Sequence, residues 1–534
     1  MMQSLYRPLS SLAVIAAFTL AACEKKEDVA KAPYEVEEVS LSQLSDDLGS
    51  GKTTSVAATE AYIHRMKTMD AGLNAVILIA PDAAQQAAAS DQRRKDGKSL
   101  GPLDGIPILF KDNIDTMGLR TTAGSYALEF NVPEKDSTVV ARLRAAGAVI
   151  LGKVNTSQWA GFRTSKGLNG STVGKGPHNP YDLTRTPAGS SSGSGIAAAT
   201  SFAAATVGTD TGGSIIGPSN NNGVVGLKPT ISLVPRTGIV PISMDQDSAG
   251  PMGRTVRDVA LLLNVMAGSD PADAWSKEAD AHKKDYVAAL STDALKGKRI
   301  GVLRGMRGYD ETTQPLFQEA LGVLKSQGAE LVEVTPGSIP NASDEMRIIL
   351  LYSFKEDINN YLAGAPAAVK SRTLTDLIAF NNADPRESMH SSDIFEDADK
   401  TVGGRQAPEY LAAHTSAKQK TQAEGFDKVL RDYNVVAMVN PTAGPAEVIQ
   451  PDGTATSHAI KVPAGAAVSA TASTMIAGYP HLSVPMGLIN GLPVGLSFIS
   501  TAWQEELLLS LGYAYEQASK KRVPPTAYKS VAAN

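Results

Sequence analysis

Two glycine- and serine-rich segments near the middle of the chain, together with one upstream lysine, carry the residue types most suited to chemistry. Pro187 to Gly195 reads PAGSSSGSG, and Gly208 to Ser214 reads GTDTGGS. Lys111 follows the apolar run IPILF. A serine on a glycine-flanked turn, nearby backbone amides and a buried lysine are sufficient to attack a carbonyl carbon without a histidine. The three segments therefore predict a nucleophilic site.

The first segment has the composition of a flexible linker, but the residues after it argue against that interpretation. Ile196 to Thr206 is alanine-rich and apolar throughout, which predicts a helix buried on all sides. A flexible linker is not expected to lead directly into a buried helix. We therefore interpret PAGSSSGSG as a tight loop whose backbone is open to a ligand.

The second segment ends in Ser214, and its glycines allow the backbone to turn sharply. Consecutive amides on such a turn can point at one spot and hold a developing oxyanion. The loss of one such donor typically costs about 3 to 4 kcal/mol of barrier. The alternative is a glycine turn with a purely structural role.

Lys111 must be neutral near pH 7 to act as a base, and an unperturbed pKa of about 10.4 would prevent that. Burial away from counter-charges lowers the pKa of a lysine by up to roughly 3 to 5 units. The apolar residues before Lys111 favour burial, although most lysines lie on the surface. Asp112 and Asp115 would oppose the shift if they faced the same pocket.

A serine–histidine mechanism is the alternative interpretation of the first segment. Gly189 to Gly193 fits G-x-S-x-G, with Ser191 as the nucleophile. That mechanism needs a late histidine oriented by an acid, and only His481 lies beside a predicted strand late in the chain, with no clear acid near it. No histidine pair has the spacing of a helical metal site and Cys23 is the only cysteine, so we expect no metal or cofactor.

The chain resembles the amidase signature family. The resemblance rests on Lys111, the serine cluster at Ser190, the segment ending at Ser214, and Gly223 to Thr230 (GVVGLKPT). It extends from about Leu41 to Ser519. Three further segments support it: TTAGS at Thr121 to Ser125, GKVN at Gly152 to Asn155, and GLPVGL at Gly491 to Leu496. Within the family, AGSSSGSG and the segment Trp159 to Arg163 are similar to those of bacterial peptide amidases.

The resemblance implies an amidase that hydrolyses carboxamide C–N bonds in peptide or small-molecule amides through an acyl-enzyme. It implies that Ser214 is the nucleophile, that Ser190, after a cis peptide bond with Gly189, is the bridging serine, and that Lys111 is the final proton acceptor. It places the oxyanion site at the amides of Thr211, Gly212, Gly213 and Ser214. A non-catalytic binding protein of the same fold is the further alternative.

Two positions depart from the family pattern. Ile216 stands where arginine is common, and Ser192 replaces a common glycine. The missing arginine removes a charge that would pair with Asp210 or with an acidic substrate. We therefore do not expect a specificity for substrate carboxylates.

The remaining pattern predicts an α/β fold with a large mixed, mainly parallel twisted sheet covered by helices on both faces. The expected strands are 106–110, 148–154, 300–303, 331–334, 435–439, 482–485 and 494–499, and the expected helices are two within 41–70, then 137–146, 316–324 and 505–517. GSGKTT at Gly49 to Thr54 is interpreted as the turn between the first two helices, because Asp46 stands where a phosphate-binding loop needs glycine. One domain over 41–525 is expected, with a helix-rich peripheral layer at about 269–422.

The start of the chain predicts export. Arg7 precedes the apolar stretch Leu12 to Ala22, which is too short to span a bilayer, and LAAC ending at Cys23 resembles a bacterial lipobox. We expect a signal peptide over 1–22, a lipidated Cys23, and a tether over 23–40. This predicts a periplasm-facing lipoprotein of the bacterial envelope, with Glu24 favouring the outer over the inner membrane.

Charge and location exclude some partners. The net charge is −5 without a basic block, which disfavours nucleic-acid binding. A secreted chain would also not meet the cytosolic partners of the tRNA-dependent amidotransferases in this family. The sequence does not indicate an oligomeric state.

Overall fold

The computed structural model describes residues 34–163, 170–335, 337–455 and 468–528. By their contacts these residues belong to one compact unit, which begins at Tyr34. The predicted signal peptide, Cys23 and most of the predicted tether lie outside the described residues. None of the helices in the described ranges is long and apolar enough to cross a bilayer.

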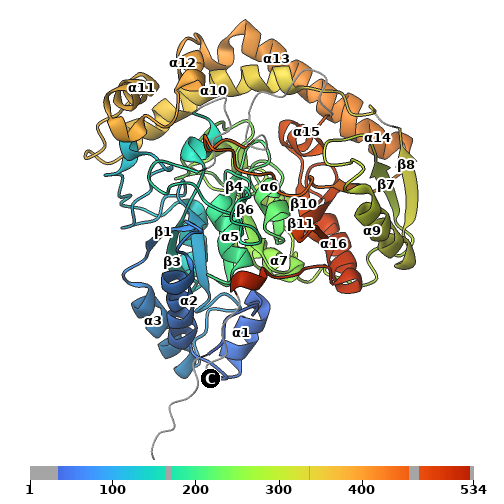
Figure 1. Ribbon diagram of the computed structural model, residues 1–534, viewed down its shortest axis with the longest axis horizontal. Helices are drawn as coiled ribbons and strands as arrows, with labels where there is room; N and C mark the ends of the chain where they lie inside the picture. The colour runs from blue at the N-terminus through green and yellow to red at the C-terminus, as the bar shows by residue number, and fades with distance from the viewer. Residues whose placement is uncertain (1–33, 164–169, 336, 456–467, 529–534) are drawn as a thin grey trace, which may run out of the picture. The chain divides into compact units, whose positions relative to one another are not determined.

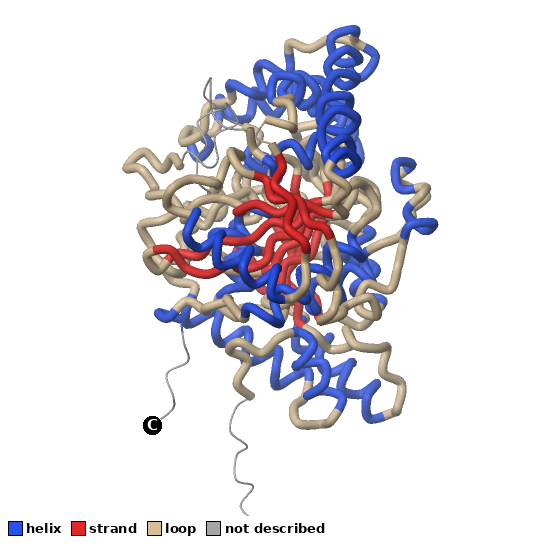
Figure 2. The backbone as a smooth tube through the Cα atoms, turned by 90° about the vertical axis from the view of Figure 1, so that its right-hand side faces the viewer, coloured by secondary structure: helices blue, strands red, loops and turns tan. Residues whose placement is uncertain are grey.

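One sheet of eleven strands runs through the unit, and Figure 2 shows helices on both sides of its strands. The strands lie in the order β1 (Val76–Ile79), β3 (Val149–Val154), β2 (Pro107–Lys111), β4 (Ala205–Asp210), β6 (Ser248–Gly253), β5 (Val225–Lys228), β10 (His481–Ile489), β11 (Leu492–Ile499), β9 (Ala437–Pro441), β7 (Arg299–Leu303) and β8 (Glu330–Val334). All seven predicted strands are present, and the mixed α/β sheet is confirmed.

Parallel pairing is confined to two parts of the sheet, so the expectation of a mainly parallel sheet was wrong. β3, β2 and β4 run parallel to one another, as do β9, β7 and β8. The described pairings between these two groups, and that of β1 with β3, are antiparallel. Antiparallel neighbours need no crossover helix, and β10 and β11 are joined directly by a tight turn.

Twelve α-helices in the described residues lie outside residues 343–418. They are α1 (Leu41–Gly49), α2 (Ser55–Met69), α3 (Ala83–Lys95), α4 (Thr138–Ala145), α5 (Ser192–Ala199), α6 (Ile216–Asn221), α7 (Val256–Met266), α8 (Ala279–His282), α9 (Gln314–Ser326), α14 (Asp427–Asp432), α15 (Ala470–Ala477) and α16 (Glu505–Ser519). The predicted helices are present, including the pair α1 and α2 with its connecting turn. In the predicted helix 137–146, Ser137 precedes α4 and accepts from the Val140 amide as its N-cap, and Gly147 follows that helix with φ +86°.

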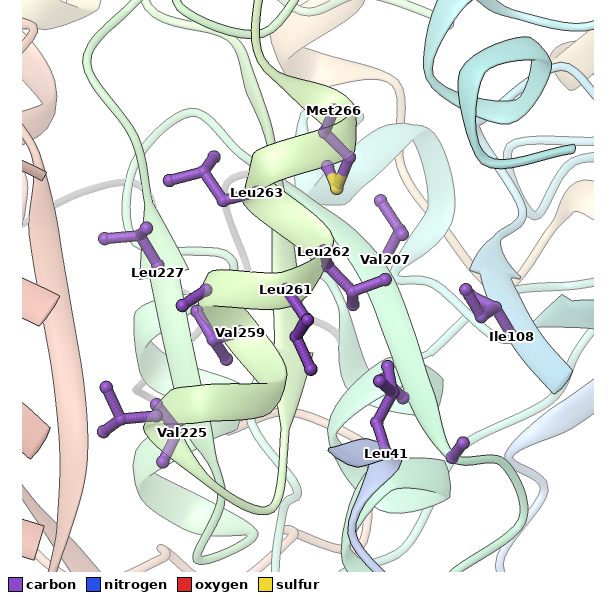
Figure 3. Packing of buried hydrophobic residues seen from close by; sticks show 14 of the residues in the cluster. Leu41, Ile108, Val207, Val225, Leu227, Val259, Leu261, Leu262, Leu263 and Met266 are labelled. Atoms are coloured by element: carbon purple, nitrogen blue, oxygen red, sulfur yellow. The ribbon is translucent and has the colours of Figure 1, made fainter. Parts of the chain in front are cut away.

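Helix α7 illustrates how the core is formed. Its residues Val259, Leu262 and Met266 recur at helical spacing and belong to one buried cluster with Val207 of β4 and Leu227 of β5 (Figure 3). Burying side chains of this size contributes about 1.5 to 3 kcal/mol each. The main core therefore surrounds the central strands that lead to the serine-rich loops.

The peripheral layer is shorter than predicted. Residues 343–418, which we call the cap, contain α10 (Ser343–Gly364), α11 (Leu374–Ala383), α12 (Asp393–Asp399) and α13 (Pro408–Lys418) and lie together at one side of the sheet in Figure 1. The predicted layer also included β7 and β8, which precede the cap, but these two strands form an edge of the sheet. β7 pairs parallel with β9, and β8 pairs parallel with β7, which draws this polar stretch into the main fold.

The predicted helix over 196–206 was wrong in its bounds. Helix α5 starts at Ser192, inside the serine cluster, and ends at Ala199, while Ala205 already begins β4. The alanine-rich composition fits both elements because both are fully buried. Pairing of β4 with β2 and β6 decides the strand conformation of Ala205 and Thr206, since a buried backbone must satisfy its hydrogen bonds.

Candidate active site

Lys111 ends β2, a fully buried strand between β3 and β4, and its own side chain is fully buried. Its Nζ donates to Ser190 Oγ at 2.7 Å and to Thr209 Oγ1 at 2.7 Å. Thr209 lies on β4, the parallel neighbour of β2. The prediction that Lys111 stands at the end of an interior strand is therefore confirmed, and its amine touches one of the predicted serines.

Burial lowers the pKa of Lys111 to about 7, while the carboxylates of Asp210 and Asp247 act in the opposite direction. Desolvation disfavours the ammonium ion, so a substantial fraction of neutral amine is present at neutral pH. This is the protonation state that a general base requires.

Asp112 and Asp115 face a different lysine. Lys153 Nζ lies 4.0 Å from Asp112 Oδ1, and Asp115 accepts from Tyr361 Oη at 2.9 Å. Burial raises the pKa of Asp115 to about 6, and Lys153 opposes that change. Asp112 lies in the turn after β2, where its carboxylate accepts from the amides of Thr122 at 3.2 Å and Gly124 at 3.4 Å instead of from the amine of Lys111.

Backbone contacts bring Ser190 and Ser214 into neighbouring positions. The Gly189–Ser190 peptide bond is cis, as the resemblance implied. The amide of Ser191 donates to the carbonyl oxygen of Ser214 at 3.1 Å. Ser190 is buried at 2% exposure, whereas Ser214 is half-buried and so accessible to a small substrate. Lys111, Ser190 and Ser214 thus belong to one small region at the ends of β2 and β4.

The serine–histidine interpretation is wrong for this fold. The fully buried Ser191 donates its Oγ hydrogen to the Thr209 carbonyl at 2.9 Å and accepts from the Thr209 amide at 3.2 Å. His481 contacts Ser497 Oγ at 2.6 Å and Thr474 Oγ1 at 3.1 Å through its two ring nitrogens. Burial lowers the pKa of His481 to about 3, with Lys228 adding to the effect. Ser191 therefore holds two loops together, and His481 is a neutral histidine of the core.

The carboxylate of Asp210 organises the segment that carries Ser214. It accepts from the amides of Gly213 at 2.7 Å and Ile215 at 2.6 Å. The amide of Gly213 is therefore directed at Asp210, which corrects its predicted place among the oxyanion donors. The Ile216 amide lies 3.3 Å from the same carboxylate, so backbone amides satisfy the charge that an arginine at position 216 would have paired.

Thr211 and Gly212, the first two residues after Asp210, approach residues from outside this segment. Thr211 Oγ1 donates to Asp247 Oδ1 at 2.5 Å. Gly212 is exposed, and a Cβ there would lie 3.1 Å from Met346 Cε, so the first turn of α10 approaches this residue. Gly213 has φ +117°, a conformation that favours glycine, and a Cβ would lie 2.9 Å from Thr471.

Three polar residues near the lysine were not predicted from the sequence. Thr209 is the second hydrogen-bond partner of Lys111, Asn113 Nδ2 donates to Thr209 Oγ1 at 3.0 Å, and Asp247 holds Thr211. The period-two pattern of β4 would have placed Thr209 and Val207 on one face. No local sequence pattern pointed to Asp247, because its partner Thr211 is 36 residues away in the chain.

Comparisons with known proteins show the family of the chain. A sequence model of the Amidase family matches residues 57–509. A probable amidase of Arabidopsis thaliana is 34% identical over 92% of both chains. A glutamyl-tRNA(Gln) amidotransferase subunit from Synechococcus is 36% identical over 88% of this chain and 90% of that protein. The crystal structure of a peptide amidase from Stenotrophomonas maltophilia superposes with a TM-score of 0.84 and 40% identity, covering 91% and 98% of the two chains.

Proposed function

The chain belongs to the amidase family and is an amide-hydrolysing enzyme, and on that premise we propose that it acts through Ser214, Ser190 and Lys111. The observation that carries the proposal is the 2.7 Å hydrogen bond between the fully buried Lys111 Nζ and Ser190 Oγ. With the pKa of Lys111 lowered to about 7, this amine is a base within reach of a serine hydroxyl.

In the proposed reaction, Lys111 takes the proton of Ser190 while Ser190 takes that of Ser214. The Oγ of Ser214 then bonds to the carbonyl carbon, and the carbonyl oxygen becomes an oxyanion. The amides of Thr211, Gly212 and Ser214 are the proposed donors to that oxyanion, since the Gly213 amide donates to Asp210.

Collapse of this intermediate breaks the C–N bond. The proton on Lys111 returns through Ser190 to the leaving nitrogen, so ammonia or an amine departs neutral and an acyl-Ser214 ester remains. Water then attacks the ester, with the same two residues removing its proton. The carboxylic acid product and free Ser214 complete the cycle without a cofactor.

The proposed substrates are uncharged amides of peptides or small molecules. Likeness to the Stenotrophomonas peptide amidase supports the peptide class. Position 216 is the apolar Ile216, so this position offers no positive charge to a substrate carboxylate. Backbone amides already satisfy the neighbouring carboxylate of Asp210. A role beside tRNA, as in the amidotransferase relatives, is not proposed because the chain start predicts export.

We also propose that the enzyme works in the bacterial envelope, held by a lipid on Cys23 and facing the periplasm, with the outer membrane preferred. This part rests on the LAAC sequence and the short apolar stretch before it. A lipid anchor holds a folded domain at a bilayer without any spanning helix.

The decisive experiment uses protein lacking residues 1–23 and a panel of peptide and small-molecule amides, with ammonia release as the readout. Ser214→Ala should lower kcat by about 10⁴-fold or more, because no covalent intermediate can form. Mass spectrometry of wild-type protein treated with a fluorophosphonate should find the adduct on Ser214.

Ser191→Ala is the matched control, since Ser191 lies one residue from Ser190 but its hydroxyl bonds to the backbone of Thr209. It should keep the adduct on Ser214. Ligand binding with neither turnover nor adduct would instead establish a non-catalytic binding protein.

A further inference from the structure

A short loop, Ile242 to Asp247, connects the cap with the segment that carries Ser214. We call it the Asp247 loop. Asp247 Oδ2 accepts from the amides of Ile242 at 2.8 Å and Ser243 at 3.0 Å, which closes the loop on itself. Its other oxygen, Oδ1, accepts from Thr211 Oγ1 at 2.5 Å. Any displacement of this loop therefore acts on the residue that begins the proposed oxyanion turn.

Arg405 reaches this loop from the cap. It follows α12 in the chain, and its guanidinium donates to both oxygens of Asp357 on α10 at 2.9 and 2.6 Å. Its Nε donates to Asp245 of the Asp247 loop at 3.1 Å. Asp357 also accepts from the Met244 amide at 2.8 Å. One arginine thus joins a cap helix to the loop through two carboxylates that are almost completely buried, at 6% and 3% side-chain exposure.

Further contacts hold the same loop against the cap and the core. From the cap, Tyr410 Oη donates to Asp245 at 2.8 Å and Ser353 Oγ donates to Ser243 Oγ at 2.7 Å. From the core side, Arg236 donates to the Met244 carbonyl at 2.6 Å. Charge-assisted bonds of this kind are short and directional, so they define the position of the loop as well as stabilising it.

We propose that Arg405 is a positioning residue that fixes the position of the Thr211 backbone. Arg405 holds Asp245, Asp245 belongs to the Asp247 loop, and Asp247 of that loop holds Thr211. The inference rests on the proposed function, because it assigns Arg405 to the geometry of the proposed oxyanion site. Arg405 itself does not touch the reacting atoms. A misplacement of about 1 Å at such a site lowers the rate by roughly 100-fold, so a distant ion pair has a kinetic effect.

The bonding pattern distinguishes this role from simple stabilisation of the cap. A residue that only stabilised the cap would find its partners within the cap, as Arg347 of α10 does with Asp397 of α12 at 2.7 Å. Arg405 instead divides its donors between Asp357 and Glu356 in the cap and Asp245, which is 160 residues away in the chain. Arg347 is therefore the matched control, since it makes an arginine–carboxylate bond in the same layer.

The test compares Arg405→Met and Arg347→Met with wild type in amide kinetics, in the rate of fluorophosphonate labelling of Ser214, and in hydrogen–deuterium exchange of the peptide 209–216. Arg405→Met should lower kcat and the labelling rate by about 10- to 100-fold with KM changed less than about threefold. It should also speed exchange in 209–216. Arg347→Met should change none of these beyond about twofold.

Thr211→Val tests the route of the effect. With the Thr211–Asp247 bond already absent, adding Arg405→Met should slow labelling by less than about threefold further. Asp245→Asn keeps the Arg405–Asp357 pair inside the cap and should reproduce the loss if Arg405→Met does not fold.

The outcomes separate the two proposals. Equal losses from Arg405→Met in the wild-type and Thr211→Val backgrounds, or a rise in KM alone, would overturn the positioning role. So would unchanged exchange in 209–216. If the wild type releases no ammonia and takes no label, the proposed function is refuted. Faster exchange of 209–216 in Arg405→Met would then still support the positioning role.

Discussion

At the scale of single residues, the important feature is a lysine that the fold makes weakly basic. Burial lowers the pKa of Lys111 to about 7 although Asp210 and Asp247 oppose the change. Other buried lysines are also weakly basic, among them Lys228, whose pKa is lowered to about 7, and Lys153, whose pKa is lowered to about 8. Only Lys111 among these three donates to a serine hydroxyl in the proposed site, because Lys228 bonds to the Tyr479 carbonyl and Lys153 bonds to Thr121.

The first prediction at this scale concerns pH. Because the amine must be neutral to accept a proton, kcat/KM should fall about tenfold per unit below a pH of about 7 and level off above it. Lys111→Met should abolish the activity. Lys228→Met removes the other lysine with a pKa near 7 and should keep the inflection, measured from pH 5 to 9 with an uncharged amide. An inflection that moves with Lys228 would assign the base to that residue.

The titration of Lys111 also makes the free energy of unfolding depend on pH. The pKa of Lys111 is about 7 in the folded protein and 10.5 as the unperturbed value. Between these values the unfolded chain binds more protons than the folded one, so the free energy of unfolding rises with pH across this window. The slope from one such lysine is at most about 1.4 kcal/mol per pH unit.

At the scale of elements, close packing of helix α5 positions the serine cluster. The helix begins at Ser192, and a Cβ on Gly193 would lie 2.4 Å from the Asn155 amide nitrogen and 2.5 Å from the Ala75 carbonyl. The Gly193 amide also donates to the Asn155 carbonyl at 3.0 Å. The first turn of α5 is therefore pressed against the end of β3, which determines where Ser190 and Ser191 enter the site.

The prediction for this element is a pair of glycine substitutions. Gly193→Ala should lower the free energy of unfolding by about 1 to 3 kcal/mol, because both near atoms belong to backbone that cannot move easily. Gly217→Ala in α6 is the control, since its Cβ would lie 3.5 Å from Ala188 Cβ, an ordinary contact. The control should be neutral or stabilising by up to about 1 kcal/mol. Urea unfolding of both variants checks this, and equal destabilisation would contradict the packing argument.

At the scale of the whole molecule, buried polar contacts attach the cap to the main fold. Glu387, between α11 and α12, accepts from Ser125 Oγ at 3.0 Å and from the Tyr126 amide at 2.7 Å, and forms a buried ion pair with Arg163. At the start of the described chain, Glu38 accepts from Arg522 Nη2 at 3.1 Å. One ion pair thus joins the cap to the main fold, and another joins the two ends of the compact unit to each other.

The prediction at this scale concerns the anchor. Cys23→Ser in the full chain should move the protein from the membrane fraction to the soluble fraction, because the cysteine that would carry the lipid is gone. Its kcat/KM with a small amide should stay equal to that of wild type, since the proposed site uses only residues from 111 to 214. Fractionation and an amide assay of both proteins check this. A variant that stays in membranes would contradict the anchor.

The sequence by itself determined much of the local structure and the identity of the chemical groups. The apolar run before Lys111, the pattern of residues 137–146 and the helical spacing around Leu316 to Leu324 are local, so they predicted β2, α4 and α9. The two serine-rich segments and Lys111 were sufficient to propose a nucleophile and its base, and the structure places them in one region.

Only the tertiary structure decided which groups face one another. The sequence offered no means to know that Asp112 faces Lys153, that Ser191 bonds to Thr209, or that the antiparallel pairings outside the two parallel groups exist. Arg405 and Asp245 are 160 residues apart, and no periodic pattern relates them. Local propensity depends on neighbours in the chain, whereas pairing and side-chain direction depend on contacts that form only when distant segments are buried together.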